Sequence, residues 1–445
     1  MNRKPSAKWA GLASLLLWLA LAGCSEEAVR EFFGHYTPRE RYEHALYEAG
    51  LDRTALGRDW LAAADAALDG AISILSPYRE ESYLDPREVS ATAYHVFLRR
   101  GQQLEVQFES EPDTSYRVFI ELFRMTGRPD APPRHLASAD SLERSLDHLA
   151  RLDGDYLIRI QPELLRGGRY TISIVVKPSL QFPVSGRDAT AIGSWYGDGR
   201  DGGRRRHEGL DIFAPRGTPV LAAADGVVRS TRSNRLGGNV VWLRDRMGHT
   251  HYYAHLDTVL VQRRQQVSVG DTLGLVGNTG NARTTPPHLH FGIYSSGSFD
   301  PYPALQRLPT TPADFTGDRG LIDQQVRVTR SAARLRAHPT ARSEVLAELP
   351  LHTPLHVEAG TGGWYRVKAP DGTSGFVAAN LTEPADRPLR SEVLASGATI
   401  LLDPAATAVA VESIAAGAEL PVLGAFGDFL FVQSPSGRLG WLALD

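Results

Sequence analysis

Histidines gather in one stretch of the 445-residue chain, which opens with the run His207-Glu208-Gly209-Leu210-Asp211 and closes with His288-Leu289-His290. Six of the 14 histidines lie in it: His207, His249, His251, His255, His288 and His290. Two imidazoles and one carboxylate fit a catalytic zinc site, in which three protein ligands leave a fourth position for water. The stretch therefore predicts metal-assisted hydrolysis.

The residues around these histidines predict strands and turns. Glycine, proline and β-branched residues follow His207, as in the run from Asp211 to Val220. Side chains two or four positions apart on a strand share a face, so His288 and His290 point the same way and His207 can join Asp211. The run at His207 is not the helical H-E-x-x-H motif, because Asp211 stands where that motif has its second histidine.

The order of the motifs resembles the lysostaphin-type zinc endopeptidases, which cut peptidoglycan cross-bridges. The resemblance covers about residues 190–305. Its matching segments are His207-x-x-x-Asp211, Gly217-Thr218-Pro219-Val220, Asp225-Gly226-x-Val228, Tyr253-Ala254-His255-Leu256, Val269-Gly270-Asp271-x-Leu273-Gly274, Gly277-x-Thr279-Gly280 and His288-Leu289-His290-Phe291. One difference is Gly292, where many members carry an acidic residue.

The resemblance implies a role for each matching residue. His207, Asp211 and His290 would hold one Zn²⁺ ion, while His255 and His288 would line the site without binding the metal. We assign the base that accepts the water proton to His288, and stabilisation of the oxyanion to His255.

Strand parity indicates two further residues close to the candidate ligands. By strand parity His251 and Tyr253 share a face with His255, so they are candidates for a supporting position behind the ligands. Asp225 and Asp245 are interpreted as turn or surface acids.

The implied reaction is hydrolysis of peptide cross-links in peptidoglycan by attack of metal-bound water. The bond from D-Ala to diaminopimelate is favoured, and a glycine bridge is the other possibility. Some relatives of this family have lost ligands and act as non-enzymatic activators of cell-wall amidases, and a pure wall-binding lipoprotein is a third hypothesis. The intact ligand set favours the enzyme.

The composition is that of a soluble globular protein, with 42% hydrophobic and 22% charged residues. The net charge is −3 and there is no long basic run, which argues against nucleic-acid binding. The length is typical of about three domains, and it indicates no particular oligomeric state.

The first 24 residues are typical of a bacterial export signal. Arg3, Lys4 and Lys8 precede a short apolar run that ends in Leu21-Ala22-Gly23-Cys24. This ending resembles a lipobox, which implies cleavage before Cys24 and lipid attachment to that thiol, the only cysteine in the chain. We therefore expect a lipid-anchored protein of the cell envelope, at the outer membrane facing the periplasm, bound to the membrane through Cys24. An ordinary cleaved signal with a free cysteine is the alternative.

The rest of the chain predicts a mainly β, multidomain protein. A tether and two short helices occupy 25–87, with a capping box at Thr37 and Glu40 and a second helix over about 58–68. Five alternating segments predict an antiparallel β-sandwich over 88–178, interpreted as a spacer or a glycan binder. An antiparallel sheet with the metallopeptidase site follows over 179–306.

An internal repeat fills the C-terminal part. Gly372 and Gly375 follow one aromatic strand segment, and Gly437 and Gly440 follow another in the same spacing. This predicts two small β-barrels, over 320–384 and 385–445. The first resembles bacterial SH3-like domains, so binding to peptidoglycan is expected, with a structural appendage as the alternative. The run Arg204-Arg205-Arg206 is either a solvated loop or a cleft edge that meets acidic peptide stems.

Overall fold

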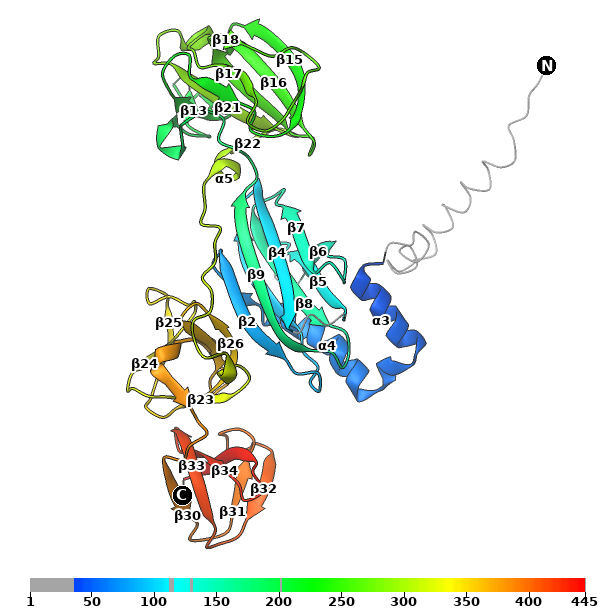
Figure 1. Ribbon diagram of the computed structural model, residues 1–445, viewed down its shortest axis with the longest axis vertical. Helices are drawn as coiled ribbons and strands as arrows, with labels where there is room; N and C mark the ends of the chain where they lie inside the picture. The colour runs from blue at the N-terminus through cyan, green and yellow to red at the C-terminus, as the bar shows by residue number, and fades with distance from the viewer. Residues whose placement is uncertain (1–35, 112–115, 129–130, 201, 445) are drawn as a thin grey trace, which may run out of the picture.

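The computed structural model describes residues 36–111, 116–128, 131–200 and 202–444. It confirms a mainly β, multidomain chain. Figure 1 shows the histidine domain (residues 179–306) at one end, a β-sandwich in the middle, and two small barrels at the other end. Within the described ranges no helix has the length and apolar character to cross a membrane. The predicted lipid attachment at Cys24 lies outside the described residues.

Two helices open the described chain. Helix α3 spans Pro38–Glu48, and its predicted capping box is present, with the Thr37 hydroxyl accepting from the Glu40 amide and the Glu40 carboxylate accepting from the Thr37 amide. Helix α4 spans Ala55–Asp69 and begins earlier than predicted, because Thr54 caps it by accepting from Gly57 N. The helices pack on the sandwich, where the Trp60 indole donates to Pro162 O at 2.9 Å.

The sandwich consists of two facing sheets that enclose one apolar core. One sheet has the order β1-β3-β8-β5-β6, and the other contains β2-β9-β4-β7. The strands are β1 Ile72–Ser73, β2 Tyr78–Leu84, β3 Thr92–Leu98, β4 Gln102–Glu111, β5 Val118–Arg124, β6 Arg134–Ser138, β7 Ser145–Leu149, β8 Gly154–Pro162 and β9 Gly168–Pro178. All five predicted strands are present, but the predicted start at residue 88 is too late, because β2 pairs with β9 along its length.

Strand β2 also joins the sandwich to the first barrel. It pairs with β26 (Pro354–Thr361) through Glu81↔Gly360 and Ser82↔Ala359, so one sheet runs across both domains. Beside this junction the buried Glu80 carboxylate accepts from Arg366 of the barrel, with two nitrogen–oxygen distances of 3.2 Å. The first barrel is therefore fixed to the sandwich through a buried ion pair.

The two barrels have matching hairpins. The first barrel contains β23 Gln325–Val328, β24 Ala333–Arg336, β25 Val345–Leu349, β26, β27 Trp364–Lys368, β28 Ser374–Ala378 and β29 Thr382–Pro384. The second contains β30 Arg390–Val393, β31 Ala398–Leu401, β32 Ala410–Ile414, β33 Glu419–Phe426, β34 Phe429–Gln433 and β35 Leu439–Ala443.

The repeated glycines have the same physical reason in both barrels. A Cβ atom at Gly375 would lie 2.8 Å from Leu335 Cγ, and one at Gly440 would lie 2.4 Å from Ile400 Cγ2. Each glycine lets the second hairpin strand cross close to the neighbouring strand, as in both copies of the predicted repeat.

The histidine domain is built on an antiparallel sheet of order β10-β13-β21-β17-β16-β15-β19. Its strands are β10 Ile192–Ser194, β13 Leu210–Phe213, β15 Gly226–Asn234, β16 Gly238–Asp245, β17 Thr250–Leu256, β19 Gln266–Val267 and β21 His288–Tyr294, with β22 Ser298–Phe299 paired to β21. A smaller sheet of β14 Pro219–Leu221, β18 Thr258–Val259 and β20 Thr272–Leu275 also belongs to the domain. The short helix α5, Tyr302–Leu305, follows.

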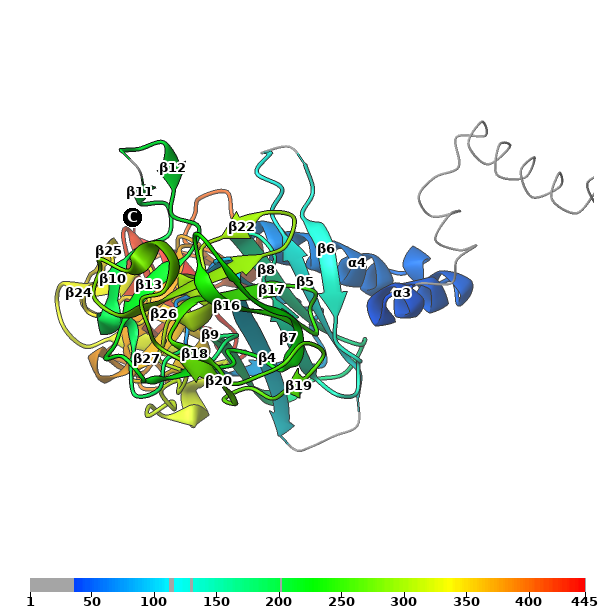
Figure 2. The ribbon, with the colours of Figure 1, turned by 90° about the horizontal axis from the view of Figure 1, so that it is seen from above.

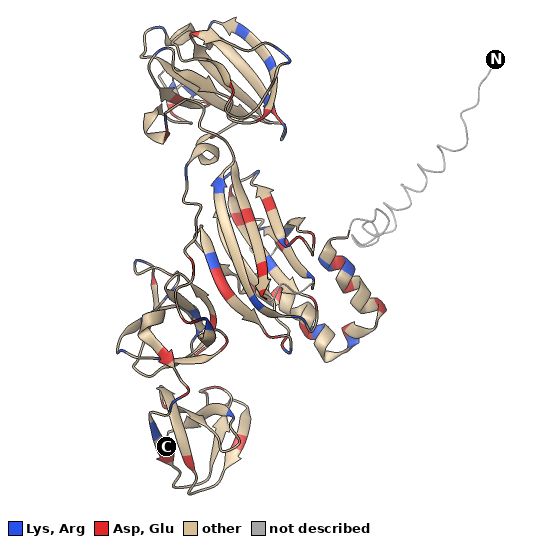
Figure 3. Cartoon of the chain, viewed as in Figure 1, with Lys and Arg blue, Asp and Glu red and all other residues tan. Residues whose placement is uncertain are grey.

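Two further strands form a hairpin that stands away from this sheet. Strand β11, Gly199–Arg200, pairs with β12, Arg205–Arg206, and together they are called the arginine hairpin. Figure 2 shows it projecting from the histidine domain. In Figure 3 basic and acidic residues are interspersed along the described part of the chain, consistent with the small net charge.

Candidate metal and catalytic site

Strand pairing brings the predicted ligands together. Strands β13 and β21 pair in the register Asp211↔His290, and β17 pairs with the other edge of β21 in the register Ala254↔His290. Phe291 and Ile293 point to the opposite face and are buried in the core. The sheet therefore sets Asp211 and His290 side by side, and His207 reaches them from the segment before β13.

Three atoms converge at this point. His207 Nε2 and His290 Nδ1 each lie 2.9 Å from Asp211 Oδ1, and the two ring nitrogens lie 2.9 Å from each other. His207 Nδ1 donates to the Trp195 carbonyl at 2.8 Å, which leaves Nε2 with a lone pair directed at the other two atoms. Two imidazole nitrogens and a carboxylate oxygen at one point fit a zinc ion.

The electrostatics keep Asp211 and His290 in the forms that bind a metal. Burial alone would raise the pKa of Asp211, but its close contacts with the His207 and His290 rings hold that pKa well below its usual range. Burial lowers the pKa of His290, although Asp211 acts in the opposite direction. The carboxylate is thus ionised and the His290 imidazole neutral at neutral pH, as metal binding requires.

His255 and His288 lie beside the three ligands. Their ring centroids are 5.0 Å apart, and the His255 ring lies 6.0 Å from that of His290. His255 Nδ1 donates to Thr279 O and His288 Nδ1 to Pro286 O, each at 2.9 Å. In this tautomer Nε2 of each ring is a hydrogen-bond acceptor. Burial, and then the neighbouring His288, lower the pKa of His255 to about 4.

The backbone at His255 explains why strand parity misleads there. His255 has a φ of 62°, in the left-handed region, so its side chain leaves the face that alternation along β17 predicts. The amide of His255 donates to Gly237 O at 2.7 Å, which holds this turn of the chain.

The structure does not place His251 and Tyr253 in the predicted supporting position behind the ligands. Both point to the core face of β17, where His251 meets the Phe291 ring edge-on and the Tyr253 hydroxyl accepts from Ala223 N at 2.9 Å. Tyr252 has the opposite parity and contacts the site instead, with its ring centroid 5.8 Å from that of His290.

Sequence reasoning missed Tyr252, although one signal points to it. Gly292 pairs with Tyr252 across β17 and β21, so the position opposite the tyrosine on β21 carries no side chain. A Cβ at Gly292 would lie 2.8 Å from Glu208 O, so the position where many family members carry an acid is closed to any side chain here.

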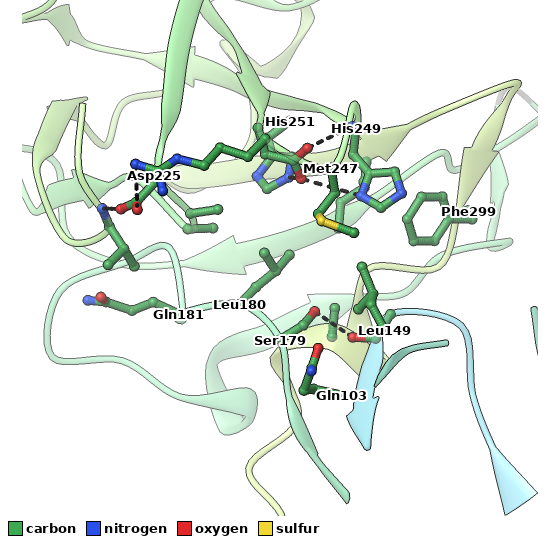
Figure 4. Close-up of a pocket in the computed structure, with 18 of the residues that line it drawn as sticks. Gln103, Leu149, Ser179, Leu180, Gln181, Asp225, Met247, His249, His251 and Phe299 are labelled. Atoms are coloured by element: carbon green, nitrogen blue, oxygen red, sulfur yellow. Dashed lines mark hydrogen bonds and ion pairs between the residues drawn. The ribbon is translucent and has the colours of Figure 1, made fainter. Parts of the chain in front are cut away.

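Asp245 opens the turn after β16, in agreement with its interpretation as a turn acid, but its side chain is buried and not at the surface. Its side chain is 6% exposed and accepts hydrogen bonds from His251 Nε2, at 3.1 Å, and from the His249 amide, at 2.8 Å. Burial acts to raise the pKa of Asp245, but the two histidines lower it overall. Figure 4 shows His249 and His251 at a cavity between the histidine domain and the sandwich. The cavity has a volume of about 500 Å³, and Asp245 is among the residues that line it.

The metal ligands and the other two histidines open into one cleft of about 850 Å³. The aromatic side chains of Trp242, Tyr252 and Tyr294 form part of its wall. Of the Arg204-Arg205-Arg206 run, Arg205 and Arg206 are among the described residues that line the cleft, and Arg204 is not. This supports the cleft-edge interpretation of the run for two of its three residues.

Arg200 contributes a contact that sequence reasoning did not foresee. One guanidinium nitrogen lies 2.6 Å from Asp211 Oδ2 and 2.7 Å from Ser194 Oγ. Asp211 therefore offers one oxygen to the histidines and the other to Arg200.

Comparisons with known proteins agree with this geometry. Residues 205–301 match the model of peptidase family M23, and residues 331–383 match the bacterial SH3 domain. The chain is 41% identical over 138 residues to an L-Ala–D-Glu endopeptidase from Bacillus subtilis, covering 28% of this chain and 42% of that protein. It is 33% identical over 179 residues to the DD-carboxypeptidase/endopeptidase Mpg of Neisseria meningitidis, covering 40% and 38%.

A solved structure, the catalytic domain of lysostaphin from Staphylococcus simulans, is 35% identical and covers 25% of this chain and 88% of its own, with a TM-score of 0.23. The chain spans about two fifths of the length of the two curated relatives described above.

Proposed function

Since residues 205–301 form a domain of peptidase family M23, we propose that the chain is a zinc-dependent endopeptidase that hydrolyses peptide cross-links of bacterial peptidoglycan. One observation carries the proposal. His207 Nε2, Asp211 Oδ1 and His290 Nδ1 converge at mutual distances of 2.9 Å, on the floor of a cleft that His255 and His288 share. A non-enzymatic activator of amidases or a wall-binding lipoprotein would not need these converging atoms.

In this mechanism His207, Asp211 and His290 would hold one zinc ion. When bound, zinc polarises a scissile carbonyl and lowers the pKa of a water molecule to about 7. The arrangement of the ligands leaves the cleft side open to substrate.

The two remaining histidines have different roles, His288 in proton transfer and His255 in stabilising the oxyanion. His288 Nε2 is an acceptor because Nδ1 donates to Pro286 O, so His288 is suited to take a proton from water and return it to the leaving amine. An oxyanion-binding role for His255 requires a proton on Nε2, which the bond to Thr279 O and the low pKa of about 4 both disfavour. An oxyanion-binding role for His255 therefore requires its other neutral tautomer, with the proton on Nε2 and the hydrogen bond from Nδ1 to Thr279 O given up.

The bond from D-Ala to diaminopimelate remains the favoured cleavage site. A relative from Vibrio cholerae, 41% identical over 93 residues, is named a peptidoglycan DD-endopeptidase, and the Neisseria relative is also named a DD-enzyme. The Bacillus relative is named for the L-Ala–D-Glu bond, so the family accommodates more than one bond.

The proposal includes a place in the cell envelope. Lipid attachment at Cys24 would anchor the chain to the outer membrane, facing the periplasm, and the motif Leu21-Ala22-Gly23-Cys24 supports this. The match to the bacterial SH3 domain supports binding of wall peptide by the first barrel. Because Glu80 and Arg366 fix that barrel to the sandwich, it would hold the sandwich in a set orientation to the wall.

Digestion of purified cross-linked sacculi tests the proposal. Protein lacking residues 1–24 and loaded with zinc is expected to convert cross-linked dimers into monomers, with a new free amine detected by mass spectrometry. The position of that amine identifies the bond. Unchanged dimers in the presence of fully loaded protein would contradict the proposed function.

A further inference from the structure

The arginine hairpin is attached directly to the metal site. In its register Gly199 lies opposite Arg206 and Arg200 opposite Arg205. Arg200 turns inward and binds both Asp211 Oδ2 and Ser194 Oγ, so the base of the hairpin is held at the edge of the cleft. A hairpin held in this way can present its other side chains to a substrate at a set distance from the metal ligands.

The exposed part of the hairpin brings a positive charge to the wall of the cleft. Arg206 is exposed and lines the same cleft as His207, His255, His288 and His290. Arg200 also lines the cleft, but its guanidinium is paired with Asp211. The guanidinium of Arg206 therefore presents its charge to the cleft, where it favours an anionic group of the substrate.

We propose that Arg206 is a specificity-determining residue that binds a free carboxylate of the substrate peptide, with Arg200 holding the hairpin in place. This inference rests on the proposed function, because it names the class of peptide that the same cleft selects. Peptide stems of peptidoglycan contain acidic residues whose carboxylates can be free or amidated.

The chemistry of the guanidinium group separates these two forms of the peptide. Its planar donors match the two oxygens of a carboxylate. A carboxamide has lost the charge and turns one NH₂ group toward the same donors, so it satisfies only one of them. Because Arg206 is exposed to solvent, the preference is modest and sensitive to salt.

The test compares two synthetic cross-linked peptides that differ only by a carboxylate or a carboxamide on the acidic residue. At low salt the wild type is expected to cleave the carboxylate form with a kcat/KM about fivefold higher, as for an exposed ion pair. Arg206→Gln is expected to abolish this preference, and Arg206→Lys to keep part of it because the charge remains. The zinc content of all variants should be equal.

Arg204→Gln is the matched control, since it removes one positive charge from the same exposed run but from a residue outside the cleft lining. It is expected to retain the wild-type preference. If Arg204→Gln and Arg206→Gln lose the preference for the carboxylate peptide to the same extent, the role of Arg206 is overturned and the preference is a general effect of charge. Equal cleavage of both peptides by the wild type would also overturn it.

Binding of the same peptides, measured by calorimetry on zinc-loaded wild type and Arg206→Gln, separates the two proposals. Carboxylate-selective binding that needs Arg206, in a protein that cleaves neither peptide, would support the inference and contradict the endopeptidase activity. Binding without selectivity would overturn the inference, whether or not cleavage occurs.

Discussion

A guanidinium nitrogen of Arg200 lies 2.6 Å from Oδ2 of Asp211, while the other carboxylate oxygen of Asp211 lies 2.9 Å from both His207 and His290. The two oxygens of one ligand thus have separate partners. Arg200 restricts the rotation of the carboxylate and directs Oδ1 at the metal position.

Replacing Arg200 by Gln is expected to weaken zinc retention about tenfold, because Asp211 loses the partner that orients it. Competition with a coloured chelator at pH 7 measures the zinc dissociation constant without reference to activity. Arg204→Gln removes a charge from the same hairpin and should leave the constant unchanged. An unaltered constant in Arg200→Gln would show that Asp211 is oriented without this contact.

Replacing His290 by Ala is expected to remove both zinc and cleavage, because only two ligands remain. The zinc content after dialysis, measured by atomic spectroscopy, should fall from one ion per chain to near zero. His356→Ala provides a control, since His356 lies half exposed in the first barrel. Full zinc retention in His290→Ala would mean that other residues bind the metal, which would contradict the proposed ligand set.

His288→Ala should keep its zinc and lose most of its turnover, by about 10²- to 10⁴-fold in kcat, because a positioned general base is removed. The measurement is the initial rate of free-amine release from a cross-linked peptide, together with zinc content. Wild-type kcat in this variant would exclude His288 as the base, and the role would pass to His255.

Asp245→Asn should destabilise the fold by about 2 kcal/mol at pH 7, because hydrogen bonds to a buried charged group are lost. The pKa of Asp245 is lower in the folded protein than its ordinary value of about 3.9. The contribution of ionised Asp245 to the free energy of unfolding is therefore complete above the ordinary pKa of about 3.9. It is lost as the pH falls below that value and through the lower pKa of the folded protein.

Urea unfolding at pH 7 and pH 3 measures the free energy of unfolding of both proteins. The difference in this free energy between wild type and Asp245→Asn should be smaller at pH 3. Asp65→Asn changes an exposed acid on α4 and should stay within about 0.5 kcal/mol of wild type. A difference that grows as the pH falls would contradict the direction of the pKa shift.

Arg366→Met is expected to destabilise the sandwich and first barrel together, by about 3–5 kcal/mol, because Glu80 is left as a buried, uncompensated charge. The double variant Glu80→Met with Arg366→Met should recover much of the loss. Thermal unfolding followed by calorimetry measures both. Arg334→Ala breaks an exposed pair with Glu348 at 3.9 Å and should have little effect. If the sandwich of Arg366→Met melts separately from the barrel and at the wild-type temperature, the ion pair does not fix the barrel to the sandwich.

The candidate ligands could be predicted from the sequence because their residue types fit zinc and their order matches the motifs that carry the family resemblance. Asp211 and His290 lie on neighbouring strands, and pairing in register sets them side by side. The repeated glycines were equally informative, since Gly375 and Gly440 meet the same steric need in both barrels.

The remaining features depend on contacts that local patterns do not contain. His255 joins the site through a left-handed backbone conformation, so parity along β17 gave wrong positions for His251 and Tyr253. Strand β2 was missed because it buries Glu80, which is compensated by Arg366 from a distant segment. The contact from Arg200 to Asp211 likewise depends on a hairpin that carries little sequence signal.

Zinc titration of the metal-free protein tests the central claim most directly. Release of free amine from cross-linked sacculi is measured at increasing zinc concentration, with wild type and His290→Ala side by side. The account predicts that activity rises with zinc, saturates at one ion per chain, and is absent from the variant at every concentration. Cleavage that is independent of zinc, or that persists in His290→Ala, would contradict it.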